Sequence, residues 1–382
     1  MVALEVDLKS LSVPLFQREN FGRRSRTSPF DELRTGLWQR GAREIFSCKT
    51  KLIFCLGLSV LVLHIGTAIA AEKFRIASGG FGTAIHAVLW AAYHKNIFQK
   101  YDLDAEYIAM QSGTTAMQML LAGELQCLFS GGPQPINANL HGADVTIIAG
   151  GLDFFPYKLI VRPDIKNANQ LNGKSLGITS FGSVTELATR MALEKLGVNP
   201  KQVTILQVGG SLTRYAALQS GSIQGTVMFE PLATMAVRNL GMNSLIDMAQ
   251  GGLTFPTNFF TVKRSYLTTN RIKIINSMKA IIEGLYTVKK DRTLGLQLIK
   301  RYLRVDDEMA GIGYDYYVAK HGDGILSLPE RRGLELVIEQ VARENPKPRD
   351  KRRKVWDCWS QAFWTRSRRA GLSRSSSAER SH

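Results

Sequence analysis

Small polar residues in the middle of the chain have the types and spacing of a ligand-holding turn at the start of a helix. Residues 175–179 are largely apolar, Gly182 is a turn residue, and Ser183 is followed three positions later by Glu186. This spacing is that of a capping box and predicts a helix that begins at Ser183. A helix start leaves backbone N–H groups without intrahelical partners, which favours a carbonyl or anionic ligand. Ser183 could also do no more than cap its own helix.

The same motif occurs a second time, about a hundred residues earlier. Residues 77–83 read Ala-Ser-Gly-Gly-Phe-Gly-Thr, after a short apolar run and before a helical pattern. A further pattern, Leu-x-x-Gly-x-Leu/Ile-Gln, occurs at residues 120–126 and again at 218–224. This spacing is longer than the roughly 20 to 50 residues of a solenoid repeat. Two related α/β lobes are therefore predicted.

Other predicted strands also end in small polar turns. Residues 105–110 lead into Gly-Thr-Thr at 113–115, residues 203–208 lead into Gly210, and residues 225–229 lead into Glu230. Alternating strands and helices predict mostly parallel sheets with helices on both faces. Ligands of such sheets bind beyond the carboxyl ends of the strands, so the turns are expected around one cleft between the lobes. The Glu230 carboxylate could bind a ligand amine, pair across the cleft, or simply begin a helix.

Two segments are expected to cross between the lobes and to form a hinge. The first lies within residues 145–161 and contains Phe154 and Tyr157, which could line the cleft or belong to the core. The second lies within residues 244–262. Residues 266–342 are mostly helical and are expected to pack on the first lobe. A hinge with two crossings would let the cleft close on a ligand.

The formal net charge of +17 is concentrated at the two ends of the chain. Residues 1–70 contribute +4 and residues 346–382 contribute +8, which leaves +5 for the body between them. The body has no recognised nucleic-acid motif, so no nucleic-acid partner is expected. The basic, serine-rich tail after residue 345 is predicted to be disordered or translated in a shifted reading frame. Contact with an anionic membrane is the alternative for this tail.

Residues 52–70 have the three parts of a secretory signal peptide. A positively charged flank precedes an apolar core, which ends in the small residues Ala68 and Ala70. Cleavage after Ala70 is expected, and an uncleaved membrane anchor is the alternative. The polar extension formed by residues 1–51 is unusual in front of a signal peptide, so Met1 need not be the true start.

Five short motifs, in their order along the chain, resemble those of a known family. They are residues 122–126 (Ala-Gly-Glu-Leu-Gln), 171–177 (Leu-Asn-Gly-Lys-Ser-Leu-Gly), Gly182-Ser183, 217–221 (Ala-Leu-Gln-Ser-Gly) and Glu230-Pro231. Over residues 73–345 the chain resembles the periplasmic substrate-binding proteins of ABC importers for nitrate, alkanesulfonates and taurine. That group is homologous to the enzymes that make the thiamine pyrimidine precursor.

The resemblance implies a two-lobed type II periplasmic-binding fold, in which each lobe is a mixed, mostly parallel sheet flanked by helices. It implies a monomer in the periplasm that binds a small-molecule solute without a cofactor or metal and delivers it to the permease and ATPase subunits of an importer. Lobe 1 is expected to contain residues 71–155 and 256–345, and lobe 2 residues 156–255. The ligand-binding residues implied are Ser78, Gly79, Phe81, Thr83, Gly113, Thr114, Thr115, Gly132, Phe154, Tyr157, Ser180, Gly182, Ser183, Val184, Thr185, Gly210 and Glu230.

The expected ligand is neutral or singly charged, because multiply charged phosphates usually recruit clustered Arg or Lys, which these turns lack. No enzymatic activity is expected. An enzyme of the thiamine-precursor type is one alternative, and it would consume a cofactor or a histidine such as His86. The enzymes of that type carry a cysteine cluster beside the second crossing, where residues 253–256 read Leu-Thr-Phe-Pro. A membrane-tethered sensor that keeps residues 52–70 is the other alternative.

Overall fold

The computed structural model describes residues 73–80, 82–150, 152, 154–250, 255, 257–320 and 331–344. The apolar segment 52–70, Phe81 and the basic tail therefore lie outside the described residues. Within the described ranges, no helix has both the length and the apolar composition that a membrane span requires.

Lobe 1 is built on a five-stranded sheet with the order β2-β1-β3-β10-β4. Its strands are β1 (Phe74–Gly79), β2 (Ala105–Met110), β3 (Cys127–Gly131), β4 (Val145–Gly150) and β10 (Asn258–Lys263). Strand β1 pairs in parallel with β2 and β3, whereas β10 lies antiparallel between β3 and β4. A strand from late in the chain thus completes a sheet that began almost two hundred residues earlier.

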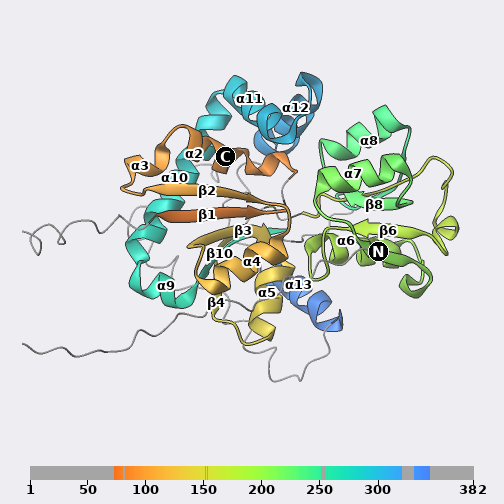
Figure 1. Ribbon diagram of the computed structural model, residues 1–382, viewed down its shortest axis with the longest axis horizontal. Helices are drawn as coiled ribbons and strands as arrows, with labels where there is room; N and C mark the ends of the chain where they lie inside the picture. The colour runs from red at the N-terminus through yellow and green to blue at the C-terminus, as the bar shows by residue number, and fades with distance from the viewer. Residues whose placement is uncertain are drawn as a thin grey trace, which may run out of the picture. The chain divides into compact units, whose positions relative to one another are not determined.

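Helices cover both faces of this sheet (Figure 1). They are α2 (Ala87–His94), α3 (Ile97–Lys100), α4 (Gly113–Ala122), α5 (Pro133–Leu140), α9 (Arg264–Thr269), α10 (Arg271–Lys290), α11 (Arg292–Leu303), α12 (Asp307–Tyr314) and α13 (Arg331–Glu344). Side chains alternate along a strand, so Ile76 joins the core beneath α2 while Ala77 packs beneath α4. Of the late helices, α10 packs on α2 and α13 packs on α5.

Lobe 2 repeats the same arrangement with the strand order β7-β6-β8-β5-β9. Its strands are β5 (Lys158–Val161), β6 (Ser175–Ile178), β7 (Thr204–Gln207), β8 (Gly225–Met228) and β9 (Asn243–Asp247). Its helices are α6 (Val184–Lys195), α7 (Ser211–Ser220) and α8 (Leu232–Leu240), with α6 on one face of the sheet and α7 and α8 on the other (Figure 1). Strand β5 is antiparallel to β8 and β9, while β6 is parallel to β7 and β8. The predicted two-lobed α/β fold with mixed, mostly parallel sheets is confirmed.

The sequence repeat corresponds to an equivalent contact in each lobe. Gln126 Oε1 accepts a hydrogen bond from a backbone N–H near the start of β1 at 2.7 Å, and Gln224 Oε1 accepts one from the first N–H of β6 at 3.0 Å. Each glutamine follows a helix that ends at a glycine with positive φ, 86° at Gly123 and 80° at Gly221. Glycine adopts this backbone without the steric cost that other residues incur. The repeated pattern therefore ties β3 to β1 in lobe 1 and β8 to β6 in lobe 2.

The two crossings between the lobes lie side by side and are hydrogen-bonded to each other. The Thr257 N–H donates to Leu152 O at 2.8 Å, and the Thr257 hydroxyl donates to Phe154 O at 2.5 Å. Closer to lobe 2, the Met248 N–H donates to Tyr157 O at 2.9 Å. The expected hinge is thus a pair of linked segments. The domain boundaries at residues 155 and 255 stay a prediction.

Candidate functional site

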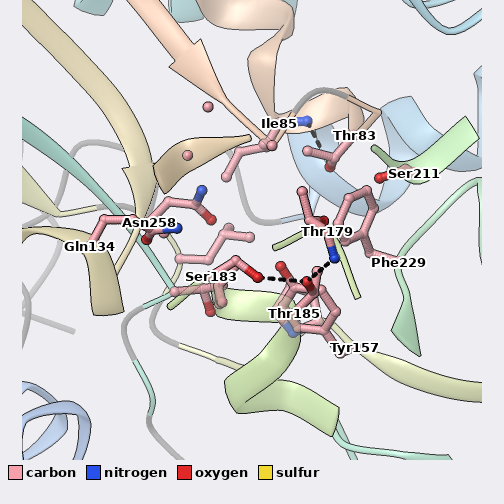
Figure 2. Close-up of a pocket in the computed structure, with 18 of the residues that line it drawn as sticks. Thr83, Ile85, Gln134, Tyr157, Thr179, Ser183, Thr185, Ser211, Phe229 and Asn258 are labelled. Atoms are coloured by element: carbon pink, nitrogen blue, oxygen red, sulfur yellow. Dashed lines mark hydrogen bonds between the residues drawn. The ribbon is translucent and has the colours of Figure 1, made fainter. Parts of the chain in front are cut away.

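A small cavity lies between the carboxyl ends of central strands from both sheets, where α/β sheets bind ligands (Figure 2). The volume open to the centre of a water-sized sphere is about 30 Å³, which is room for roughly two water molecules. Lobe 1 and the hinge contribute Gly79, Gly80, Thr83, Ile85, Gly113, Gly131, Gln134, Leu152, Pro156, Tyr157, Thr257, Asn258 and Tyr317 to its lining. Lobe 2 contributes Thr179, Ser183, Val184, Thr185, Ser211, Arg214 and Phe229.

The lobe 2 wall is the start of α6, where two hydroxyls are linked to each other (Figure 2). Ser183 Oγ accepts the Glu186 N–H at 3.4 Å, and Thr185 Oγ1 accepts the Thr179 N–H at 2.9 Å. The two oxygens lie 2.8 Å apart, so one hydroxyl donates to the other. One of the two hydroxyl protons is therefore left for a ligand. The first-turn N–H groups of α6 add donors at the same place.

The predicted capping box at α6 forms in a modified way. Ser183 is the N-cap residue, with extended backbone geometry. The Glu186 carboxylate does not return to the Ser183 N–H. It accepts the Gly182 N–H at 2.7 Å and pairs with Arg190 at 2.8 Å. Glu186 thus binds the residue before Ser183 through its carboxylate and Ser183 Oγ through its backbone N–H. These two hydrogen bonds fix the Ser183 hydroxyl at the cavity.

The side chains of Thr83, Gln134 and Tyr317 in lobe 1 line the same cavity. Thr83 Oγ1 accepts the Ile85 N–H at 3.4 Å, which leaves its own proton for Tyr317 or for a ligand. Gln134 Oε1 and Tyr317 Oη are buried and make no hydrogen bond of ordinary geometry with another described residue. Burial raises the pKa of Tyr317, so its hydroxyl stays protonated. Tyr317 lies in a π-helical turn, Asp315–Ala319, a feature common at functional sites.

Several of the predicted ligand-binding residues meet at the cavity. Those that line it are Gly79, Thr83, Gly113, Tyr157, Ser183, Val184 and Thr185. The remaining described ones lie outside its lining, namely Ser78, Thr114, Thr115, Gly132, Phe154, Ser180, Gly182, Gly210 and Glu230. Ligand contact by any of these residues stays a prediction.

Thr114, Ser180 and Gly210 lie where the two lobes touch. Ser180 Oγ donates to Thr114 Oγ1 at 3.2 Å and lies 3.0 Å from Ser112 Oγ. Gly210 lies against Gln111, so closely that a Cβ atom on Gly210 would be 1.7 Å from Gln111 Oε1. These hydrogen bonds and this close approach are direct contacts between the lobes. We call them the rim contacts.

Ser78, Gly132 and Phe154 each contact another residue of lobe 1 or of the hinge. Ser78 is fully buried and its Oγ lies 2.6 Å from Tyr107 Oη. The Gly132 N–H donates to the carbonyl of the second crossing at 2.9 Å. The Phe154 ring meets the Tyr316 ring edge to face, with centroids 5.9 Å apart. These three residues thus make contacts within the protein and do not line the cavity.

Glu230 lies just before the start of α8 and pairs within its own lobe. One carboxylate oxygen accepts the Thr234 N–H in the first turn of α8 at 3.1 Å. The other accepts from Lys158 Nζ at 2.7 Å, and the same ammonium lies 3.5 Å from Asp247. Of the three roles considered for Glu230, the structure therefore shows the helix-start role.

A second, wider space opens beside the cavity, and we call it the outer groove. Its volume is about 460 Å³. It is lined by Thr114, Met117, Gln118, Leu121, Gln134, Asn137, Ala138, His141, Phe181, Gly182, Glu186 and Arg190. Gln134 lines both the groove and the cavity. In the described ranges, no group of three or more His, Cys, Asp or Glu residues could hold a metal ion.

Comparison with known proteins identifies the family. Residues 83–291 match the family model described as NMT1/THI5 like. The chain belongs to the NMT1/THI5-like family. This result confirms the resemblance that the short motifs indicated.

Relatives of this NMT1/THI5-like protein include a protein of Brucella abortus (strain 2308) that is named as a predicted binding protein. It is 26% identical over 237 residues, which are 60% of this chain and 71% of the relative.

Solved structures with the same fold include the alkanesulfonate-binding protein SsuA of Xanthomonas axonopodis pv. citri, bound to MOPS. It has a TM-score of 0.62 at 16% identity and covers 76% of this chain and 99% of its own. The periplasmic nitrate-binding protein NrtA of Synechocystis PCC 6803 has a TM-score of 0.63 at 15% identity and covers 78% of this chain and 89% of its own. At these identities the likeness establishes the fold alone.

The sequence reasoning missed several residues that line the cavity of this NMT1/THI5-like protein. They are Ile85, Gln134, Leu152, Thr179, Ser211, Arg214, Phe229, Thr257, Asn258 and Tyr317. Arg214 had a visible signal, because Ser211, Arg214 and Leu218 follow helical spacing and place an arginine on the apolar face of α7. Tyr317 had none, because a π-helical turn far along the chain brings it to the site.

Proposed function

We propose that this protein is the solute-binding receptor of an ABC importer. It captures a small polar or singly anionic solute between its lobes in the periplasm and delivers it to membrane permease and ATPase subunits. It acts as a monomer, without catalysis and without a nucleic-acid partner. The family membership and the fold shared with the SsuA and NrtA proteins support this assignment.

One observation carries the ligand chemistry of the proposal: both lobes direct hydrogen-bond donors into one small cavity. In lobe 2, the Ser183–Thr185 pair leaves a hydroxyl proton unused, and Ser211 Oγ accepts a hydrogen bond from Arg214 while keeping its own proton. In lobe 1, Thr83 Oγ1 accepts the Ile85 N–H and keeps its own proton. Donors on opposite walls favour a compact ligand rich in acceptor atoms, such as a carboxylate, nitrate or sulfonate. A ligand held by both lobes stabilises the closed arrangement over an open one.

Isothermal titration with nitrate, short sulfonates, short carboxylates and pyrimidines tests the proposal. One class should bind saturably and be recovered unchanged. Consumption of the solute or of a cofactor would favour the enzyme alternative instead. His86 offers no support for that alternative, because it does not line the cavity.

Ser183→Ala should weaken binding of the captured solute by roughly 5- to 10-fold, because it removes one hydroxyl from the lobe 2 wall. It should also lower the stability of α6 by about 1 kcal/mol through loss of the cap. Ser265→Ala is the matched control, since Ser265 is exposed on α9 and does not line the cavity. Wild-type affinity in a folded Ser183→Ala protein would rule out this wall as the ligand site.

A further inference from the structure

Arg214 is an arginine buried against the cavity and held only by neutral groups. Its side chain is fully buried in α7. Nε donates to Gly209 O at 3.2 Å, Nη2 donates to Ser211 Oγ at 3.2 Å, and Nη1 donates to Thr226 Oγ1 at 2.8 Å and to Val227 O. Every partner is a carbonyl or a hydroxyl. The guanidinium is therefore fixed in place, but its charge is not neutralised.

No carboxylate of the described residues forms an ion pair or a hydrogen bond with this guanidinium. The titratable group that acts on it electrostatically is the Tyr157 hydroxyl, which also lines the cavity. Burial lowers the pKa of Arg214 to about 10, which still leaves the side chain charged at neutral pH. A buried charge without a counter-charge is strongly unfavourable. An anion in the cavity would supply the missing charge.

The geometry also gives Arg214 a route to a ligand. A guanidinium has five N–H groups, and the four hydrogen bonds named above leave one N–H on Nη2 unassigned. The Ser211 hydroxyl accepts from Nη2, so its own proton is polarised and free to point into the cavity. Figure 2 shows Ser211 near Thr83, on the opposite lobe. A ligand oxygen between these groups would accept a hydrogen bond from the Ser211 hydroxyl, which the Arg214 charge polarises.

We propose that Arg214 is the anion-selecting residue of the cavity, acting through Ser211 and its remaining N–H. The inference rests on the proposed function and narrows its ligand to a compact monoanion. A merely structural arginine, one that only clamps the turn before α7 to β8, would stabilise the fold without regard to ligand charge. The two roles are separated by comparing charged and neutral ligands of the same shape.

The experiment measures binding of matched pairs, nitrate with urea and acetate with acetamide, by isothermal titration. The members of each pair have equal numbers of non-hydrogen atoms and differ in charge. The wild-type protein should prefer the anion of at least one pair by more than about 10-fold. In Arg214→Met the affinity for that anion should fall roughly 10- to 100-fold, while affinity for the neutral partner stays the same.

Each outcome decides between the roles. An unchanged preference in folded Arg214→Met overturns the inference. Equal binding of charged and neutral partners by the wild type overturns it too, while saturable binding itself leaves the proposed function standing. Failure of the wild type to bind any of these four solutes overturns this inference, while saturable binding of a pyrimidine would leave the proposed function standing.

Should Arg214→Met fail to fold, Ser211→Ala decides instead. It removes the hydroxyl between the guanidinium and the ligand and leaves the buried charge in place. Its preference for the anion should fall several-fold. If Ser211→Ala prefers the anion over its neutral partner as strongly as the wild type does, the proposal is overturned.

Discussion

At the scale of single residues, His86 is a histidine buried among aromatic rings in lobe 1. It is fully buried between Trp90 and Phe129, whose ring centroids lie 6.0 and 5.6 Å from its own. Neither ring nitrogen has a hydrogen-bond partner among the described residues. Burial lowers its pKa to about 3, so the imidazole is neutral at physiological pH.

The stability of the protein should therefore fall in mild acid. Below the ordinary histidine pKa of 6.5 the unfolded chain binds a proton at this position, whereas the folded chain does not until about pH 3. Between these values the His86 contribution to the free energy of unfolding falls with decreasing pH by at most about 1.4 kcal/mol per pH unit. His86→Phe should weaken this dependence, which urea denaturation between pH 7 and pH 4 would reveal.

The control for this prediction is His141→Gln, because His141 is exposed. It should keep the wild-type dependence of unfolding on pH. The same pH dependence in His86→Phe as in the wild type would show that His86 does not cause it.

Single residues were predictable where local sequence decides their role. Ser183, Thr185 and Gly113 were recognisable because small polar residues after an apolar strand must form a turn and a helix start. Tyr317 was not, because a π-helical turn brings it to the cavity. The helical spacing of Arg214 showed that it is buried, but its position at the cavity depends on how the whole of α7 packs. The turns also gave no means of telling cavity residues such as Thr83 from rim residues such as Thr114, since both follow a strand in the same way.

At the scale of elements, the rim contacts show how the turns of one lobe meet those of the other. The turn before α4 brings Gln111 and Ser112 to the lobe boundary, and the turns before α6 and α7 bring Ser180 and Gly210 to meet them. Gly210 has φ of −61°, which alanine adopts without strain. The backbone conformation therefore does not require glycine at position 210. The close approach of the Gln111 side chain does.

Gly210→Ala should therefore disfavour the closed arrangement without unfolding either lobe. The new methyl group would displace the Gln111 side chain, which is exposed and free to move aside. Ligand affinity should fall about 3- to 10-fold, because closure and binding are coupled. The dissociation constant and the melting temperature, measured together, check this.

The matched background for this test is Gln111→Ala. In that background, adding Gly210→Ala should change the affinity little, because the obstructing group is absent. An equal loss of affinity in both backgrounds would mean that Gly210 acts through another contact.

The elements themselves were largely predictable, and their order in the sheets was not. The repeated Leu-x-x-Gly-x-Leu/Ile-Gln pattern revealed two equivalent units because each glutamine ties its own strand to a parallel neighbour, β3 to β1 and β8 to β6. No local pattern showed that β10 would insert between β3 and β4, or that β5 would lie between β8 and β9. Such pairings depend on contacts between residues far apart in the chain.

At the scale of the whole described molecule, the charged contacts between the lobes are weak. Arg238 pairs with Glu308, and Arg343 lies 3.6 Å from Glu194, with all four side chains more than half exposed. Exposed pairs of this kind typically contribute only about 0–1 kcal/mol. Closure thus depends mainly on the hinge, the rim contacts and whatever occupies the cavity.

A captured solute should therefore raise the thermal stability measurably. At a free ligand concentration about 100 times the dissociation constant, the folded state gains roughly 2.7 kcal/mol. For a chain of this size, that corresponds to a rise in melting temperature of about 5–10 °C. Thermal melts with the solute, compared with sodium chloride at equal ionic strength, measure it. A solute that binds by calorimetry but leaves the melting temperature unchanged would contradict the expected link between binding and the folded state.

The position of β10 beside β4 has a consequence for how the chain is organised. Gly150 near the end of β4 pairs directly with Phe259 of β10, as the two arms of a hairpin would. Every strand of lobe 2 lies in the sequence between those two residues. Lobe 2 is thus an insertion into the turn of a hairpin that belongs to lobe 1. During synthesis its sheet can form from one continuous stretch, while the sheet of lobe 1 must wait for a strand made after lobe 2 is complete.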